Sequence, residues 1–346
     1  MLEGQVAVLS AGYISSENSL KLLDALKNSA LFRKDQYSYL LYPNKELSRF
    51  VVKNNIPAEK VEKLELAQQL LKANNSQIIE KDCLGNYHFN GNFNNANSLK
   101  TALSVLPKSY KKLVEKDEKQ LLAIFEEVFN HKEFTGRSGT FFGYEGLGSI
   151  YWHMVSKLLL SVQEICIKAI NENENKDIIN RLKTHYYEIN EGIGVHKSPE
   201  LYGAFPTDPY SHTPAGKGAQ QPGMTGQVKE DILCRFGELG VAVKEGKLQF
   251  KAGLLKQEEF LSTSSIFKYT DVQQQKQEIV LPANSLGFTY CQVPIIYKKA
   301  KNNSVEVICN NNTIKFSELE LNSSVSSQIF DRTGDVKQIT VSINNI

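Results

Sequence analysis

The chain has 346 residues, of which 41% are hydrophobic and 23% are charged, and its formal net charge at pH 7 is +2. These values are those of an ordinary globular protein, and the small net charge gives no electrostatic reason to expect binding to nucleic acid or to a membrane. No stretch approaches the roughly 18 apolar residues of a membrane-spanning helix, and no signal peptide is visible. We therefore expect a cytoplasmic protein with one large and one small domain, or two domains.

Cysteine and histidine usage argues against a disulfide framework and against a metal centre. The six histidines are scattered without the spacing of metal ligands, and no CxxC pair occurs. The cysteines are odd in number and far apart, so free thiols in a reducing compartment are expected. They stand at positions 83, 166, 234, 291 and 309.

The first 258 residues show mainly helical patterns. The segment 148–170 is the most hydrophobic and is predicted to lie in the core, whereas the Asn-rich segment 73–98 predicts a hairpin or another excursion on the surface. Thr225 can cap a helix over 226–238 that Gly240 ends. Further helices are predicted at residues 17–30, 58–73, 107–129 and 178–187.

Beyond about residue 260 the pattern changes to short alternating runs rich in Val, Ile, Tyr and Thr, bounded by Asn-rich or Gly-containing turns. Such runs predict antiparallel strands. The expected organisation is therefore mainly α, with a helical domain over 1–258 and a small antiparallel β domain over 259–346. There is no βαβ rhythm, which disfavours a dinucleotide-binding fold.

A long polar loop precedes the helix at 226–238. Residues 205–230 contain four prolines and four glycines around Asp208, His212, Lys217 and Thr225. A connector would be far shorter, and a rigid polar loop that leads into a helix N-terminus is suited to fixing an anion or a sugar. Nucleotide-binding glycine motifs, the GxSxG elbow and HExxH do not occur. Because 12 of the 22 glycines fall within 136–226, we expect function to be concentrated there.

Three sequence blocks together resemble the inverting glycoside phosphorylases of glycoside hydrolase family 94, which act on cellobiose, chitobiose and β-1,2-oligoglucans. The first is GQVAVLSAG at residues 4–12, and the second is GSIYWH at 148–153. The third combines Asp208-Pro209-Tyr210, Gly216 and the GMTG of residues 223–226. Their order and spacing agree over about residues 1–255.

The resemblance implies part of an (α/α)6 toroid followed by a small β domain. It also implies that inorganic phosphate, as co-substrate, attacks the anomeric carbon of an oligosaccharide without any cofactor. By this resemblance phosphate is held by His153, Thr225 and Gly226. The substrate-cleft residues are Asp208, Tyr210, His212, Lys217 and Trp152. Without the resemblance, His153 and Trp152 are equally well explained as core residues.

The general acid of the family lies in a segment that would precede Met1, so no catalytic residue is assigned and the chain resembles a C-terminal half. Its partner would be the missing N-terminal half or a second copy. Gln227 follows the Thr-Gly pair where the family has small residues, which favours the β-1,2-oligoglucan branch. Two alternatives stay open: a non-catalytic carbohydrate-binding remnant, and a glycoside hydrolase with Glu230 or Asp231 as its base.

Overall fold

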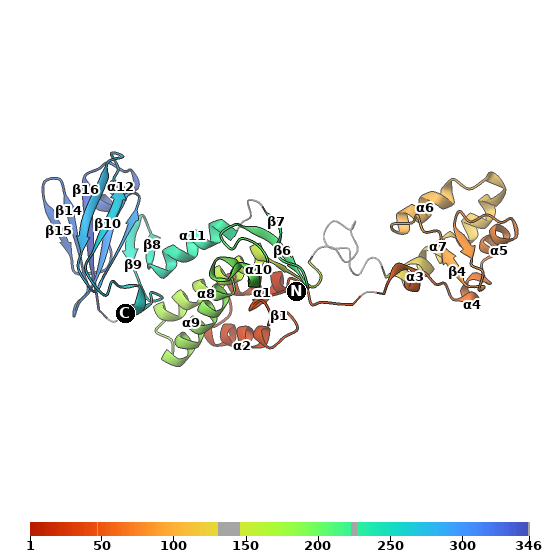
Figure 1. Ribbon diagram of the computed structural model, residues 1–346, viewed down its shortest axis with the longest axis horizontal. Helices are drawn as coiled ribbons and strands as arrows, with labels where there is room; N and C mark the ends of the chain where they lie inside the picture. Colours follow the sequence, from red (N-terminus) through yellow and green to blue (C-terminus); the bar gives the residue numbers. More distant parts are fainter. Residues whose placement is uncertain (47, 131–145, 223–226, 345–346) are drawn as a thin grey trace. The chain divides into compact units, whose positions relative to one another are not determined.

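The computed structural model describes residues 1–46, 48–130, 146–222 and 227–344 (Figure 1). The chain forms two compact units. The first combines Met1–Leu41 with Ile150–Ile346, and the second is Tyr42–Ser149. The second unit is therefore inserted into the sequence of the first, and we describe each by itself.

Helix α8 (Trp152–Asn171) is the centre of the first unit. It is buried on nearly every face, as expected for a helix that is hydrophobic all round. Its core contains Leu residues from both sides of the inserted unit in sequence, which confirms the core position predicted for 148–170. The helices packed against it are α1 (Leu2–Ser10), α2 (Ser16–Lys27), α9 (Lys176–Glu191) and α11 (Gln227–Glu238).

The ends of these helices follow local side-chain chemistry. The Ser15 side chain accepts the backbone N–H of Asn18 and caps α2, and Asn175 caps α9 in the same way. Gly240, with φ of +70°, follows α11 in the left-handed conformation that glycine tolerates best. The predicted stop at Gly240 is thus confirmed.

Small sheets complete the first unit outside its C-terminal part. Strands β5 (Ser149–Tyr151), β6 (Tyr210–Pro214) and β7 (Gln220–Pro222) form a three-stranded sheet, so much of the predicted loop 205–230 is a hairpin. Short hairpins also join β1 (Phe32–Arg33) to β2 (Ser38–Tyr39) and β8 (Val241–Lys244) to β9 (Lys247–Phe250). The short elements α10 (Pro199–Tyr202), η3 (Gly194–His196) and η4 (Gln257–Glu259) connect them.

The C-terminal part is a β structure, drawn in blue in Figure 1. Its five-stranded sheet has the order β12-β13-β16-β14-β15, and β10 pairs with β11 in a separate hairpin. Most neighbours are antiparallel, but β13 and β16 are parallel, because helix α12 (Ser323–Phe330) and strands β14 and β15 form the crossover between them. The strands are β10 (Ser265–Thr270), β11 (Lys276–Leu281), β12 (Ser285–Tyr290), β13 (Val293–Lys299), β14 (Ser304–Cys309), β15 (Thr313–Phe316) and β16 (Val336–Ile343).

The second unit, Tyr42–Ser149, has a core of its own. Its helices pack on the hairpin of β3 (Ile79–Lys81) and β4 (Tyr87–Phe89), which confirms the hairpin predicted within 73–98. The predicted surface position is wrong, because Ile79 and Phe89 are buried in the core of this unit. The helix predicted at 58–73 is divided in two. The helices are α3 (Phe50–Lys53), α4 (Ala58–Val61), α5 (Glu65–Lys72), α6 (Ala96–Ser104), η1 (Lys108–Tyr110) and α7 (Lys111–Phe129).

The expected mainly α fold with an (α/α)6 toroid is wrong. Helices and strands are mixed throughout the described residues, and the helices of Tyr42–Ser149 enclose a hairpin and bury their apolar faces in a separate core. Hydrophobic periodicity shows that a helix buries one side, but it does not show which partner covers that side. A row of helices in the sequence can therefore suggest a ring, although the described residues do not form one. The domain boundary predicted at residues 258 and 259 stays a prediction.

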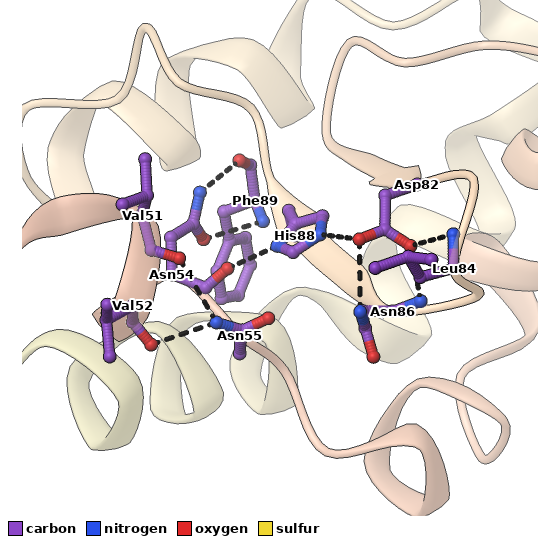
Figure 2. Close-up of polar contacts among 9 residues, drawn as sticks. All are labelled: Val51, Val52, Asn54, Asn55, Asp82, Leu84, Asn86, His88 and Phe89. Carbon is purple, nitrogen blue, oxygen red and sulfur yellow. Dashed lines mark hydrogen bonds and ion pairs between the residues drawn. The ribbon is translucent and has the colours of Figure 1, made fainter.

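Buried polar side chains hold the second unit together (Figure 2). The Asn54 amide pairs with the backbone of Phe89 in both directions, with Nδ2 2.8 Å from the carbonyl oxygen and Oδ1 2.9 Å from the amide nitrogen. In the same unit, the buried Asp117 carboxylate on α7 accepts the backbone N–H of Leu66 at 2.8 Å and so caps α5. These bonds join segments far apart in sequence.

His88 links the end of α3 to the β3–β4 turn (Figure 2). Its Nδ1 contacts the carbonyl oxygen of Asn54, and its Nε2 lies 3.1 Å from Oδ2 of Asp82. Both neighbours are acceptors, so the protonated ring, which has two N–H donors, can donate to both of them. The hydrogen bond to Asn54 and the nearby Asp82 raise the pKa of His88 above its ordinary value.

No helix of the described ranges is both long enough and apolar enough to cross a lipid bilayer.

The stability of the second unit should fall as pH rises through the pKa of folded His88. This pKa is raised, so the stabilisation is complete below the unfolded value of about 6.5 and is lost at higher pH. Hydrogen exchange of α7 amides, measured on the full chain from pH 5 to pH 9, should show this loss of protection. In His88→Gln the dependence should flatten, and an unchanged profile would contradict the assignment.

Gly203 and Gly218 pack against each other in the first unit with no room for a side chain at position 218. A Cβ at Gly218 would lie 2.2 Å from the carbonyl oxygen of Gly203, and backbone cannot easily move aside. Gly218→Ala should therefore destabilise the unit by about 1–3 kcal/mol. Denaturant unfolding followed by Trp152 fluorescence measures this. The control is Gly4→Ala within α1, where nothing lies within 4 Å and alanine should be neutral or stabilising.

Candidate functional site

The first sequence block lies against the central helix. Residues 4–10 belong to α1, and the chain then turns at Gly12, whose φ is +65°. Ser10 Oγ donates to Glu164 Oε2 at 2.9 Å, and Lys168 Nζ donates to the carbonyl oxygen of Gly12 at 2.9 Å. Both partners stand on α8. This block therefore positions α8, whose other end carries the second block.

Trp152 begins α8 and is only 1% exposed. Its indole Nε1–H donates to Thr213 Oγ1 on β6 at 2.8 Å, and its ring meets Tyr202 edge to face, with centroids 5.3 Å apart. The ammonium group of Lys197 lies 4.7 Å from the indole centroid. This burial favours core packing of Trp152 over stacking on a sugar.

His153, the next residue, is partly accessible. Its side chain is 25% exposed, and its two ring nitrogens make long contacts of 3.4 Å, Nδ1 with the Tyr151 hydroxyl and Nε2 with Glu230 Oε1. Glu230 is 13% exposed and stands four residues after Gly226, in the first turn of α11. Its Oε2 is buried and has no hydrogen-bond partner among the described residues. The contact thus joins His153 of the second sequence block to α11, the helix that follows the third block in sequence.

His212 extends this group of aromatic residues. It lies on β6, and its ring stacks on Tyr151 at 4.9 Å between centroids and 19° between planes. Burial lowers the pKa of His212, which therefore favours the neutral imidazole at pH 7. Its Nδ1 is 3.0 Å from Ser211 Oγ. Tyr151, His153 and His212 form one cluster at the start of α8.

Asp208 and Tyr210 are both related to Tyr202, the ring that packs on the buried indole. The Tyr210 ring meets Tyr202 edge to face at 5.8 Å. Asp208 is exposed and lines a cavity of about 140 Å³. The cavity has apolar walls and a few polar groups, as small-molecule sites do. Its walls include Tyr202, Pro206, Pro209, Gln227 and Asp231.

Asp231 lines this cavity and also a second cavity of about 420 Å³. Burial raises the pKa of Asp231, and the nearby Glu238 carboxylate raises it further. In the second cavity, Arg235 is bonded to Glu238 at 2.7 Å and to Glu259 at 2.5 Å. The charges there largely compensate one another, so the first cavity is the better candidate site.

The remaining predicted residues are less informative. Lys217 is exposed in the turn between β6 and β7 and does not line either cavity. Thr225 and Gly226 lie outside the described residues, so their proposed contact with phosphate is untested. Gln227, the first described residue after them, lines the 140 Å³ cavity.

Lys197, the buried lysine beside the Trp152 ring, belongs to none of the sequence motifs. Lys197 donates to Gln36 Oε1 at 3.2 Å, and burial together with the nearby Arg33 charge lowers its pKa to about 8. Arg33 in turn donates to the carbonyl oxygen of Thr213 at 2.9 Å. Gln36 and Arg33 stand before the inserted unit in sequence, so no local pattern could have placed them here.

Comparison with known protein families gives a match within the inserted unit. Residues 47–132 match the family described as GH149 phosphorylase insertion domain 2. This range lies inside Tyr42–Ser149, the second compact unit of the structure. No curated protein matches the chain. Residues 47–132 are therefore similar to a domain named for GH149 phosphorylases, whereas the three blocks resemble family 94.

Proposed function

We propose that this chain contributes the phosphate-binding side of a glycoside phosphorylase that cleaves β-linked gluco-oligosaccharides to sugar 1-phosphate. The observation that carries the proposal is the contact between His153 and Glu230 at 3.4 Å. It brings the histidine of the second block to the helix that begins directly after Thr225 and Gly226. The match to a phosphorylase insertion domain supports the same reaction class independently.

The geometry suits an anion that exchanges with existing contacts. Both contacts of His153 are 3.4 Å long, beyond the usual 2.7–3.2 Å of a strong hydrogen bond. A phosphate oxygen can replace one of them with a shorter charge-assisted bond. The backbone N–H groups at the start of α11 would add donors and a favourable helix dipole.

Phosphate chemistry also explains why a second catalytic carboxylate is not required. A water nucleophile needs a general base, whereas phosphate is already an anion. The leaving sugar still needs a proton, and the resemblance assigns that acid to no residue of this chain. The sugar would lie in the 140 Å³ cavity, where Tyr202 and the prolines offer apolar surfaces and Asp208 offers hydrogen bonds.

A glycoside hydrolase is the second candidate, favoured by one observation. The Oε2 atom of Glu230 is buried without a partner among the described residues, as a base awaiting a water molecule would be. Asp231, with its raised pKa, could then hold the proton for the leaving group. Sugar release in the absence of phosphate would support this candidate over the phosphorylase.

His153→Ala should weaken binding of inorganic phosphate by about tenfold or more, the cost of one hydrogen bond to a charged group. Calorimetric titration of the full chain with inorganic phosphate measures this, and it does not require turnover. The control is His196→Ala, which removes an exposed histidine of the same unit.

Equal phosphate affinities of His153→Ala and the unmodified chain would contradict the assignment of the pocket. If the unmodified chain binds no phosphate, the phosphorylase proposal itself fails.

A further inference from the structure

The C-terminal β part contains a polar cavity far in sequence from the residues discussed above. It has a volume of about 290 Å³ and is lined by three connections: the β10–β11 turn with the strand ends beside it, the β12–β13 turn, and the connection into β16 with the first two residues of that strand. Loops held by a rigid sheet are common positions for binding residues. The polar lining residues are Tyr269, Asp271, Gln273, Gln277, Gln292 and Lys337.

Asp271 fixes the shape of this cavity. Its Oδ1 accepts the backbone N–H of Gln275 at 2.8 Å, and its Oδ2 accepts Nε2 of Gln277 at 2.8 Å. Nε2 of Gln292 donates to the Asp271 carbonyl oxygen at 3.0 Å. The bond from Gln275 is the main reason that the pKa of Asp271 is lowered, so the carboxylate is ionised at neutral pH. One aspartate thus joins two of the three connections.

The backbone is held in unusual conformations around the cavity. Cys291 and Gln292, the two residues of the β12–β13 turn, have φ of 48° and 63°. Such a turn normally uses Asn and Gly, and other residues there cost of order 1 kcal/mol each. At Gly334, φ is +82°, and a Cβ would lie 2.2 Å from Nε2 of Gln273. Glycine at 334 therefore leaves room for the Gln273 amide.

The polar groups that face the cavity are suited to a neutral ligand with many hydroxyl groups. Among the described residues, the Tyr269 hydroxyl, the Gln273 amide and the Lys337 ammonium have no hydrogen-bond partner. They offer donors and acceptors of several kinds. The Lys337 charge offsets the Asp271 carboxylate, so neither an anion nor a cation is strongly favoured.

An aromatic surface continues the cavity along β10. Phe267 and Tyr269 alternate along the strand and therefore share one face. Their rings are nearly parallel, at 15° with centroids 5.7 Å apart, and both are partly exposed. Gly287 on β12 lies under Phe267, where a side chain would collide with Leu281. Paired aromatic rings beside hydroxyl-binding groups match the apolar faces and polar edges of linked sugar rings.

We propose that this cavity, with the adjoining rings of Phe267 and Tyr269, is a second carbohydrate-binding site for a short β-linked gluco-oligosaccharide. The assignment of the sugar class rests on the proposed function, whereas the site itself rests on the cavity and its lining. Such a site would hold one end of a chain-like substrate and so raise its local concentration at the enzyme.

The test is calorimetric titration of the full chain with β-1,2-linked and β-1,3-linked glucotetraoses. An Asp208→Ala background removes a residue of the other cavity. Tyr269→Ala should weaken binding about threefold to tenfold through loss of the aromatic contact, and Gln273→Ala should weaken it as well. Lys268→Ala is the control, because Lys268 points to the opposite face of the same strand and pairs with Glu278.

Absence of binding in the Asp208→Ala background, or equal affinity of the Tyr269→Ala and Lys268→Ala variants, would overturn the proposal. Gln273 is exposed in a turn, so its variant reports on binding even if Tyr269→Ala proves unstable. The failure of the proposed function is distinguishable, because it would abolish phosphate binding at His153 and leave Tyr269-dependent sugar binding in place.

Discussion

Burial of α8 is the constraint on which the rest of the first unit depends. Leu2, Leu9 and Leu23 reach its core from one side of the insertion, and Tyr186 and Leu254 reach it from the other. Removing any such side chain from a close-packed core costs about 2–5 kcal/mol, so the two sequence segments must assemble together. The inserted unit can satisfy its own apolar groups in a separate core, which makes its insertion between Leu41 and Ile150 compatible with this assembly.

The candidate site follows from how α8 begins. Trp152 is fixed by Thr213, Tyr202 and Lys197, and this anchors the first turn of the helix beside β6. His153, the next residue, contacts Glu230 in the first turn of α11. The 3.4 Å contacts of His153 contrast with the 2.8 Å hydrogen bond from the Trp152 indole to Thr213. A rigid residue next to an incompletely satisfied one is the arrangement expected where a ligand completes the hydrogen bonding.

The sequence predicted local structure better than assembly. The buried character of 148–170, the hairpin within 73–98 and the stop at Gly240 follow from periodicity and turn chemistry, and the structure confirms them. The toroid was wrong because helical periodicity does not specify the packing partner. Lys197 and Arg33 could not be found, since their contacts join residues on both sides of the insertion. The sequence offers Glu230 as a possible base, but it does not show that Glu230 contacts His153.

We infer that the two segments on either side of the insertion unfold as one cooperative unit and that the segment between them unfolds as another. Native-state hydrogen exchange of the full chain in increasing denaturant tests it most directly. We predict that amides of α1 and α2 lose protection together with those of α8, and that amides of α5 and α7 do so together at a different denaturant concentration. Loss of protection in α1 and α2 together with α5 and α7, separately from α8, would contradict this account.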